Sequence, residues 1–571
     1  MSVSSLPFLH GALAAVLPKL AAWRRDFHAH PEAGWTEFRT AALIIRRLRE
    51  LGYAIRMGEA ACASDRRMGV PSSAVLAAAR KRALEHGADA ELVAGMGDGY
   101  TGFWADLDCG PGPVTAFRFD MDCNEVAECA EESHRPVREG FASRWPGLMH
   151  ACGHDGHAAV GLGLAEVLVS IRRHLRGRIR LIFQPAEEGA RGALPMSEAG
   201  AVDGVDVLFG FHIGFKAEGP GSLICGTQGF LATTKRDVLF SGVPAHAGAA
   251  PEEGKDALLA ACSAVVNLHA ISRNGKGGTR IAVGRLEGGE ARNVIPASAR
   301  LFMETRGETT ELDAYMTAES ERILRASADL WGCACEWRTV GNSAGGGSSP
   351  ELARLIATVA EAMGGWKTVI PMSGFGATED FACLMSRVQA SGGLASYLQV
   401  GTDRAAGHHS DRFDFDETCL GRALELLARL AVRMAGGGQE DTETETESDM
   451  EFLDEVVRRK GIHVQLWLEG EDGEGFGRGR VELLQLVDEL GSLSKAAKQL
   501  GMSYRGAWGK IKKAERIAGE TLVDASGTKR DGYSLTPAGR ELVQRFQQWY
   551  ADVESFAKKR AEALFSDFDK E

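Results

Sequence analysis

The densest group of reactive side chains lies at residues 149–157, which read Met-His-Ala-Cys-Gly-His-Asp-Gly-His. One thiol, three imidazoles and one carboxylate occur there within nine residues. In an extended segment, residues i and i+2 point to the same side, so Cys152 and His154 can face one metal ion. The alternative is a polar loop that only caps the helix expected after it. The density of ligand types favours a metal site.

Two adjacent carboxylates, Glu187 and Glu188, follow an apolar strand at residues 179–184. Adjacent residues at a strand end point in opposite directions. One carboxylate can therefore bind metal while the other takes a proton from metal-bound water. A Glu-Glu pair standing alone is more often a solvated turn, so this signal depends on its neighbours.

Further imidazoles follow apolar or glycine-containing segments. His212 comes directly after an apolar strand at 207–211, and His408 and His409 lie in a loop at 401–410. Each alone would more often be structural. Thiolate, imidazole and carboxylate together are ligands that zinc, manganese or cobalt accept.

The composition is that of an ordinary globular protein, with 44% hydrophobic and 25% charged residues over 571 positions. Eleven scattered cysteines predict reduced thiols and a cytoplasmic location. We interpret residues 1–22 as an amphipathic helix rather than a signal peptide. No stretch reaches about 18 apolar residues, so we expect no membrane span. The net charge of -13 argues against nucleic-acid binding by the whole molecule but not by one basic module.

The clearest boundary is a flexible acidic linker, placed at 437–450, where glycines are followed by alternating Thr and acidic residues. Before it, strands at 114–120 and 179–184 and a helix at 157–173 predict a sheet covered by helices. The pattern then changes to strands at 235–241, 279–286 and 297–305 with helices at 251–271 and 312–331. We therefore predict a catalytic domain over 1–225 and 341–436, an inserted α+β domain over 226–340, and a further domain over 451–571.

Several of these motifs occur together in one known family. Residues 24–32, the Cys152 segment, the Glu187-Glu188 pair and His409-Ser410 with residues 413–417 match it in order. Over about residues 6–436 the chain resembles the aminoacylase and carboxypeptidase family of two-metal peptidases, in the branch of hippurate and indole-acetyl-amino-acid hydrolases. The resemblance implies an α/β fold, with a zinc-peptidase-like αβα catalytic domain and an inserted ferredoxin-like dimerisation domain. One departure is Asp411, where many relatives carry Pro.

The resemblance also implies two divalent metal ions, manganese or zinc. Cys152 would bridge them, with His154 and His212 on one ion and Glu188 and His409 on the other.

The catalytic roles are implied in the same way. Glu187 would be the general base and later the acid, and Asp120 would orient a ligand. A strand-end turn residue is the alternative for Asp120. The expected reaction is hydrolysis of the amide of an N-acyl amino acid. The resemblance, which extends to an insertion over 66–102, implies p-aminobenzoyl-glutamate as substrate, with p-aminobenzoate and glutamate as products.

Three residues of the inserted domain match family positions that act on substrate. His246 would reach into a partner's active site and stabilise the oxyanion. Asn293 and Arg306 would hold the substrate carboxylate, for which the planar fork of Arg is suited. A surface His and a surface Arg are the alternatives. The resemblance implies a homodimer or a heterodimer with a related B-type subunit.

The last region predicts a winged helix-turn-helix, with a strand at 463–469, helices at 480–490, 492–501 and 503–515, and a wing at 526–535. Residues 491–540 hold ten Lys or Arg and four acids, a local net charge of +6 within an acidic chain. The region resembles the DNA-binding domain of molybdate-responsive regulators, without their oxyanion-binding domain. Candidate DNA contacts are Ser503, Tyr504 and Arg505 to bases and Lys510, Lys512, Lys513 and Lys529 to phosphate. A helical oligomerisation module is the alternative.

Two main functional hypotheses follow. The chain is either an active amidohydrolase with a DNA-docking module or a transcriptional regulator whose amidohydrolase fold senses a ligand. The retained general base favours the enzyme. A third hypothesis, two proteins joined by a lost stop codon, is suggested by Met450 just after the linker.

Overall fold

A computed structural model describes residues 6–435, 467–469, 475–500, 502, 504–524 and 533–565. The chain divides into two compact units, Met1–Val457 and Arg458–Glu571, which we describe separately. The predicted linker at 437–450 lies outside the described residues.

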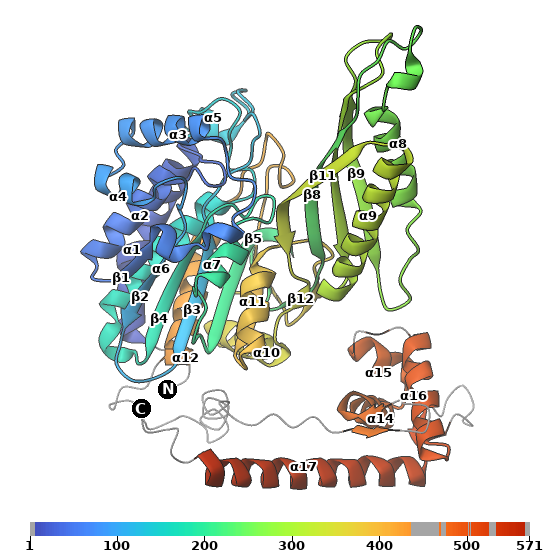
Figure 1. The fold of residues 1–571 in the computed structure, drawn as a ribbon. Coiled ribbons are helices and arrows are strands. Elements are labelled where there is room, and N and C mark those ends of the chain that lie inside the picture. Colours follow the sequence, from blue (N-terminus) through green and yellow to red (C-terminus); the bar gives the residue numbers. More distant parts are fainter. Residues whose placement is uncertain are drawn as a thin grey trace. The chain divides into compact units, whose positions relative to one another are not determined.

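The first unit is built on an eight-stranded sheet with the order β1-β2-β4-β3-β5-β15-β6-β13 (Figure 1). The four central strands β4, β3, β5 and β15 run parallel, and their apolar side chains are almost wholly buried. This explains their near-continuous hydrophobic sequences. The strands are β1 (Ala54–Met57), β2 (Phe103–Asp108), β3 (Val114–Asp120), β4 (Arg178–Gln184), β5 (Val207–Glu218), β6 (Ser222–Ile224), β13 (Thr368–Ile370) and β15 (Leu394–Thr402).

Helices cover both faces of this sheet, which gives the predicted αβα arrangement (Figure 1). One face carries α1 (Pro7–Ala29), α2 (Phe38–Glu50), α6 (His154–Ser170), α10 (Pro350–Met363) and α12 (Thr418–Ala435). The other carries α7 (Ala193–Glu198) and α11 (Phe381–Ala390). The insertion at 66–102 adds α3 (Ser73–Glu85) and α4 (Ala90–Gly95), which pack on α2, and α5 spans Arg135–Arg138.

Helix α6 begins three residues earlier than the predicted start at 157. Its N-cap Gly153 has φ +91°, a conformation that favours glycine, so the chain can turn into the helix directly after Cys152. Within α6, a Cβ at Gly161 would lie 2.8 Å from the Phe119 ring. The absence of a side chain there lets α6 lie close against β3.

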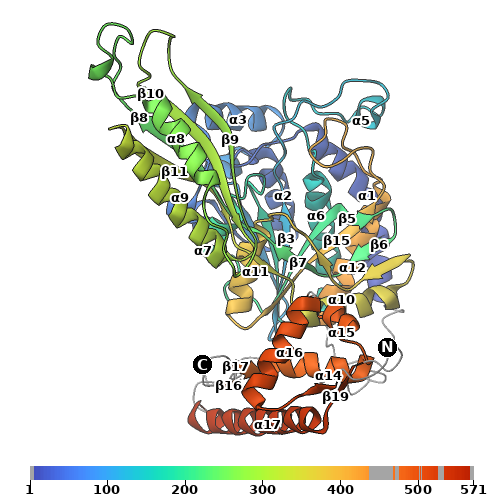
Figure 2. The same ribbon diagram turned by 90° about the vertical axis from the view of Figure 1, so that its right-hand side faces the viewer.

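The inserted region forms a separate four-stranded antiparallel sheet in the order β11-β8-β10-β9, with both helices on one face (Figure 2). The succession β-α-β-β-α-β is consistent with the ferredoxin-like insertion implied by the sequence. Its elements are β8 (Ala232–Ser241), α8 (Ala257–His269), β9 (Thr279–Gly288), β10 (Ser298–Gly307), α9 (Thr310–Leu330) and β11 (Ala334–Ser343). A small sheet of β7 (Thr227–Phe230), β12 (Gly346–Gly347) and β14 (Ser373–Gly374) lies where the chain enters and leaves it.

The predicted helix at 251–271 is wrong in its first turns. Residues 251–253 form a short 3-10 turn, and α8 starts only after Asp256, whose carboxylate accepts a hydrogen bond from the Leu259 N–H. Aspartate caps helices in this way because its side chain satisfies a main-chain donor that has no partner within the helix.

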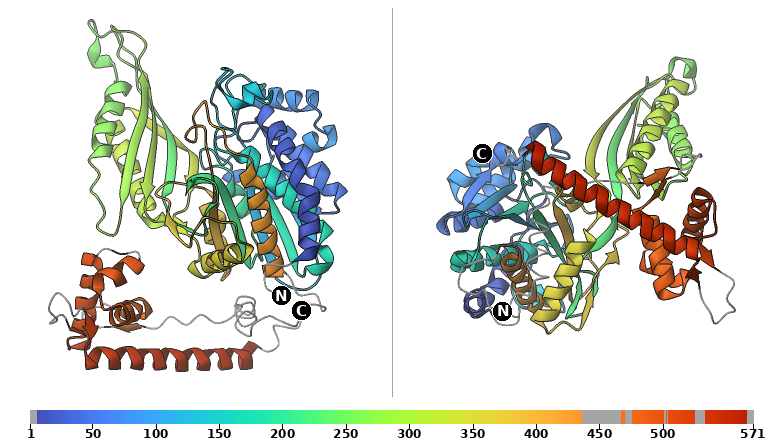
Figure 3. Two further views of the ribbon diagram at one scale, coloured as in Figure 1. Left: turned by 180° about the vertical axis from the view of Figure 1, so that it is seen from behind. Right: turned by 90° about the horizontal axis from the view of Figure 1, so that it is seen from below.

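The second unit contains the predicted helix-turn-helix as α15 (Leu493–Gln499) and α16 (Tyr504–Ala518), packed on α14 (Arg478–Leu490). Strands β18 (Val523–Asp524) and β19 (Ser534–Leu535) pair at the base of the predicted wing, and β16 (Trp467–Glu469) pairs with β17 (Gly475–Gly477). A long helix, α17 (Pro537–Phe565), was not predicted (Figure 3). Ser503, Lys529 and most of the wing lie outside the described residues.

None of the helices in the described ranges is both long and apolar enough to traverse a lipid bilayer. All eleven cysteines fall within those ranges, and none forms a disulfide.

Candidate metal centre

The predicted ligands come from four neighbouring parallel strands or the loops that follow them. Cys152 and His154 lie at the start of α6, the Glu187-Glu188 pair follows β4, His212 is in β5, and the loop after β15 carries His409. The carboxyl ends of parallel strands meet at one edge of a sheet. The topology therefore brings together residues more than 250 positions apart in sequence.

The distances confirm that these side chains converge. Cys152 Sγ lies 3.5 Å from His212 Nε2, and His409 Nε2 lies 3.2 Å from Glu188 Oε1. Cys152, Glu188 and His409 each offer one ligand atom, and these atoms lie within 4.8 Å of one another. The ligand atoms of His154, Glu187 and Glu188 satisfy the same limit. All five predicted ligands and the predicted base therefore share one site.

The buried ring of His154 shows that this site suits a cation. Its Nδ1 is bonded to the main-chain oxygen of Asp122 at 2.9 Å, while Nε2 is buried and has no hydrogen-bond partner among the described residues. A buried polar atom without a partner is costly. Nε2 approaches Glu187 Oε2 only to 4.0 Å. A metal ion held by this set of sulfur, nitrogen and oxygen donors would supply the missing partner.

Protonation in the site follows from burial and close charges. Burial and the Glu188 carboxylate raise the pKa of the Cys152 thiol well above its ordinary value. Burial opposes protonation of His154, but the Asp120 carboxylate and a hydrogen bond with Asp122 raise its pKa overall. A bound cation would displace protons from these ligands, since metals bind thiolate and neutral imidazole.

The two adjacent glutamates have opposite electrostatic environments. Burial, together with the carboxylates of Glu379 and Glu188, raises the pKa of Glu187 well above its ordinary value. Burial is the largest influence on Glu188 and acts in the same direction, but the imidazoles of His409 and His154 together outweigh it and lower the pKa of Glu188 to about 2. Two carboxyl groups with separated pKa values are suited to different tasks, one handling protons and the other staying ionised.

Asp120 makes its hydrogen bonds to residues other than the predicted ligands. Its carboxylate accepts from His157 Nδ1 at 2.5 Å and from Arg118 Nη1 at 2.6 Å, and lies 3.8 Å from His154 Nε2. His157 in turn accepts the Ile213 N–H through Nε2 at 3.0 Å. The sequence placed His157 in the motif but gave it no role. Its two filled ring nitrogens make it a support for β5 rather than a free ligand.

The loop that carries both glutamates, residues 185–193, is held by three buried carboxylates that the sequence did not reveal. Asp122 accepts the N–H groups of residues 187 and 188, each at 3.0 Å. Glu37 accepts the Ala186 N–H at 2.8 Å, and Asp380 accepts those of residues 192 and 193 at 3.1 and 2.9 Å. Ala186 has φ +49°, which is strained for a residue with a Cβ. Five main-chain bonds keep the loop in this conformation.

A buried charged network links the two ends of the site. Arg24 of α1 donates to Asp155 at 2.8 Å and to Asp414 at 2.9 Å. His28 is clamped between Asp155 and Glu128, at 2.8 and 3.0 Å. Asp155 directly follows the predicted ligand His154, and Asp414 lies five residues after the predicted ligand His409. Arg24 therefore ties the first turn of α6 to the loop after β15.

The substrate-binding residues predicted in the insertion do not converge within one chain. His246 follows the end of β8, and its Nδ1 accepts the N–H groups of residues 248 and 249, so the ring proton is on Nε2. The Asn293 carbonyl accepts the N–H of residue 247 nearby. Arg306 is eight register positions away from this end of the sheet, about 27 Å, and pairs with Glu304 at 2.8 Å.

In the helix-turn-helix unit, the candidate DNA-binding residues that the structure describes differ in their exposure and in their contacts with other side chains. The Tyr504 hydroxyl lies 2.9 Å from that of Tyr533 beside the wing strands. Lys512 pairs with Glu515 at 2.7 Å and lies over the Trp508 ring. Arg505 and Lys510 are exposed, whereas Lys513 is half-buried.

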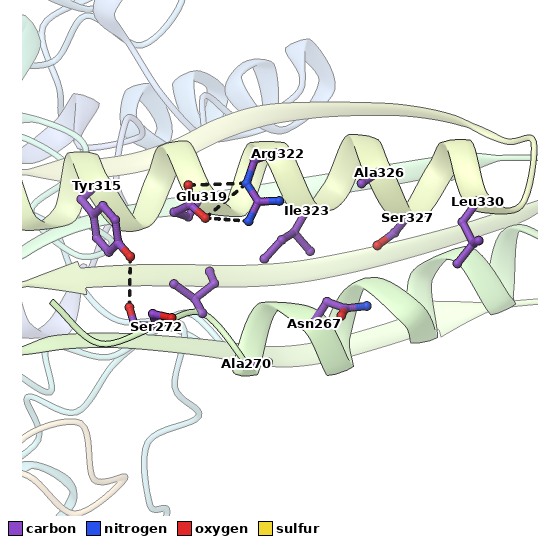
Figure 4. A pocket seen from close by; sticks show the side chains of 11 residues that line it. Asn267, Ala270, Ser272, Tyr315, Glu319, Arg322, Ile323, Ala326, Ser327 and Leu330 are labelled. Atoms are coloured by element: carbon purple, nitrogen blue, oxygen red, sulfur yellow. Dashed lines mark hydrogen bonds and ion pairs between the residues drawn. The ribbon is translucent and has the colours of Figure 1, made fainter.

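A surface pocket of about 410 Å³ lies elsewhere, between α8 and α9 of the insertion (Figure 4). At one end of it Tyr315 donates to the Ser272 carbonyl oxygen, and Arg322 pairs with Glu319. The lining contains none of the predicted site residues.

Comparison with known proteins decides the family. Residues 116–433 match the model of "Peptidase family M20/M25/M40", more than half of the chain. The chain belongs to this family. Residues 479–540 match "Bacterial regulatory helix-turn-helix protein, lysR family". The predicted helix-turn-helix is therefore confirmed.

Relatives of this M20 chain span nearly all of its first unit. It is 45% identical over 420 residues to the A-type subunit of p-aminobenzoyl-glutamate hydrolase from Escherichia coli, covering 73% of this chain and 96% of the relative. It is 44% identical over 429 residues to indole-3-acetyl-aspartic acid hydrolase of Enterobacter agglomerans, covering 75% and 98%. These matches confirm the resemblance described from the motifs.

Solved structures of similar proteins support the same family assignment. An aminobenzoyl-glutamate utilization protein from Klebsiella pneumoniae matches with a TM-score of 0.65 and 40% identity over 74% of this chain and 98% of its own. A dinuclear metal binding peptidase of the M20 family from Bacillus subtilis matches with a TM-score of 0.51 and 25% identity over 73% and 98%.

Proposed function

We propose that this protein is a metal-dependent amidohydrolase that cleaves an N-acyl amino acid, with p-aminobenzoyl-glutamate as the expected substrate. The convergence of Cys152, Glu188 and His409 beside Glu187 carries this proposal. The relatives' named substrates, p-aminobenzoyl-glutamate and indole-3-acetyl-aspartic acid, support an amide whose amino acid bears two carboxylates.

Two divalent ions, manganese or zinc, are expected in the centre. Cys152, His154, His212, Glu188 and His409 would hold them, with His154 and His212 as one pair of ligands and Glu188 and His409 as the other. When bound, the ions would polarise the amide carbonyl and lower the pKa of a water molecule. The raised pKa of Glu187 suits a group that takes a proton from that water and passes it to the leaving nitrogen.

We propose that the substrate site is completed by a second chain, either another copy or a related B-type subunit. His246 and Asn293 lie far from Arg306 in register, so one chain cannot bring all three to one substrate. With its proton on Nε2, His246 can donate to an oxyanion in the partner's site. Strand β9, an exposed edge of the insertion sheet, offers main-chain groups for a partner strand.

We propose that the second unit binds DNA. Exposed Arg505 and Lys510 on the second helix of the helix-turn-helix support this. Because Glu515 already pairs with Lys512, we expect Lys512 to contribute less. The cysteines, all outside disulfides, support a cytoplasmic location.

The test is a hydrolysis assay with the full-length protein, p-aminobenzoyl-glutamate and a panel of N-acyl amino acids, with manganese or zinc and with a chelator. We expect turnover that metal supports and the chelator abolishes. No turnover of any substrate with metal present would overturn the enzyme proposal and leave the ligand-sensing regulator. Salt-dependent binding of a promoter-fragment pool tests the DNA-binding unit.

A further inference from the structure

We propose that Arg191 and Lys235 form a two-cation clamp that binds the side-chain carboxylate of the substrate's amino acid and so selects dicarboxylic amino acids. This inference rests on the proposed amidohydrolase function. The α-carboxylate would remain with Arg306 and with Asn293 of the partner subunit.

Arg191 is oriented by neutral groups only. Its Nε donates to the Glu188 carbonyl oxygen at 2.9 Å, and its Nη1 donates to the Gly69 carbonyl oxygen at 3.2 Å. Guanidinium has five N–H donors, so three remain. In the described part of the chain no carboxylate pairs with Arg191. Its fork is therefore fixed three residues from a predicted metal ligand, with its charge unmatched.

The chain leaves space for this side chain at two glycines. A Cβ at Gly34 would lie 2.8 Å from Arg191 Nη2, and a Cβ at Gly69 would lie 2.8 Å from Arg191 Cδ. Gly69 also has φ +60°, which favours glycine. Gly69 belongs to the inserted segment 66–102, so that insertion helps to build the cradle of Arg191.

Lys235 approaches the same loop from the inserted domain. Its Cδ would lie 3.2 Å from a Cβ at Gly341, and that Cβ would overlap the Gly189 carbonyl oxygen. A Cβ at Gly189 would in turn lie 3.0 Å from Arg191 Nε. Arg191 and Lys235 therefore flank one glycine, directly after Glu188.

Lys235 is also left without a counter-charge. Its partner in register on β10 is Glu304, but the carboxylate of Glu304 pairs with Arg306 at 2.8 Å. No ion pair of Lys235 occurs among the described residues. Lys235 and Arg191 are both half-buried. Two partly desolvated cations beside one loop favour an anion, and carboxylate suits the fork of Arg and the point charge of Lys.

The test compares two substrates that differ by one charge, p-aminobenzoyl-glutamate and p-aminobenzoyl-glutamine. Charge-assisted hydrogen bonds contribute about 1.5–3 kcal/mol, about 10- to 150-fold. We expect Arg191→Gln and Lys235→Gln, in the metal-loaded full-length protein, each to lower kcat/KM for the glutamate compound by that factor, mainly through KM. The glutamine compound should change little, and Arg191→Lys should recover part of the loss. Arg387→Gln, which removes a surface ion pair with Asp203, is the matched control.

Equal losses on both substrates would show that these residues only support the fold and would overturn the clamp, as would no loss on either. Calorimetric binding of both compounds to Glu187→Gln protein separates the clamp from the reaction. Arg191-dependent preference for the glutamate compound without any wild-type turnover would sustain the clamp and reject the enzyme proposal. Wild-type cleavage of both compounds with equal kcat/KM would overturn the clamp and sustain the enzyme proposal. If the protein neither binds nor cleaves either compound, both the clamp and the enzyme proposal are overturned.

Discussion

The metal centre and the outer end of the inserted sheet contain candidate residues of the same reaction, but they are built differently. At the centre, ligands from separate segments converge, and three of them, Cys152, His154 and His212, are buried. At the end of the insertion, His246 and Asn293 are exposed and stand about 27 Å in register from Arg306. The contrast teaches that the ligands of one region come together within a single chain, whereas the exposed residues of the other fit the proposed role of a second chain.

The largest effect should come from the centre. Glu187→Gln removes the proposed base while keeping the side-chain size, so we expect kcat to fall about 100- to 10,000-fold. Metal content, measured by mass spectrometry of the purified variant, should stay unchanged because Gln replaces no predicted ligand. Unchanged activity would mean that another group handles the proton.

At the insertion, His246→Ala should lower kcat about 100- to 1,000-fold, the usual effect of removing one oxyanion donor. The exposed position predicts an unchanged melting temperature. Mixing unfolded His246→Ala and Glu187→Gln chains and refolding them together should restore activity, because mixed dimers contain one site with both groups intact. If the mixture stays inactive, His246 does not act across the dimer.

The support of the glutamate loop gives a smaller, structural effect. Asp122→Asn replaces one carboxylate oxygen, which accepts a main-chain N–H, with an amide that cannot accept. We expect the free energy of unfolding to drop by about 1–3 kcal/mol. Thermal denaturation measures the loss, with Asp108→Asn, on the surface, as the control. Equal melting temperatures for the two variants would contradict the role of Asp122.

The smallest effect concerns pH. Burial and Arg24 oppose protonation of His28, but hydrogen bonds with Asp155 and Glu128 raise its pKa above the ordinary 6.5. A raised pKa in the folded state stabilises the fold fully below pH 6.5 and less as pH rises through the shifted value. The melting temperature of wild type relative to His28→Gln should therefore be highest in mild acid and decline towards alkaline pH. A difference that grows with pH would contradict the charged clamp.

The sequence reveals residues whose chemistry is concentrated locally, and it misses those that act through the fold. Cys152 and His154 stand out because they share one short motif, and the central strands stand out because they are apolar. Glu37 and Asp380 gave no signal, since each supports a loop about 150 or 190 positions away. The sequence predicts that His246 and Arg306 act on the same substrate, and the strand register is what shows that they lie far apart within one chain. The start of α8 was misplaced because Pro251 and two acids resemble a helix start.

The main-chain hydrogen bonds that hold the loop at 185–193 have a practical consequence. Its path is set by amide hydrogens and by acceptors on three other segments, and none of these five bonds uses the side chains at 187 and 188. Substitutions at these two positions should therefore alter reactivity and ion affinity without reshaping the chain, which makes them clean probes of chemistry.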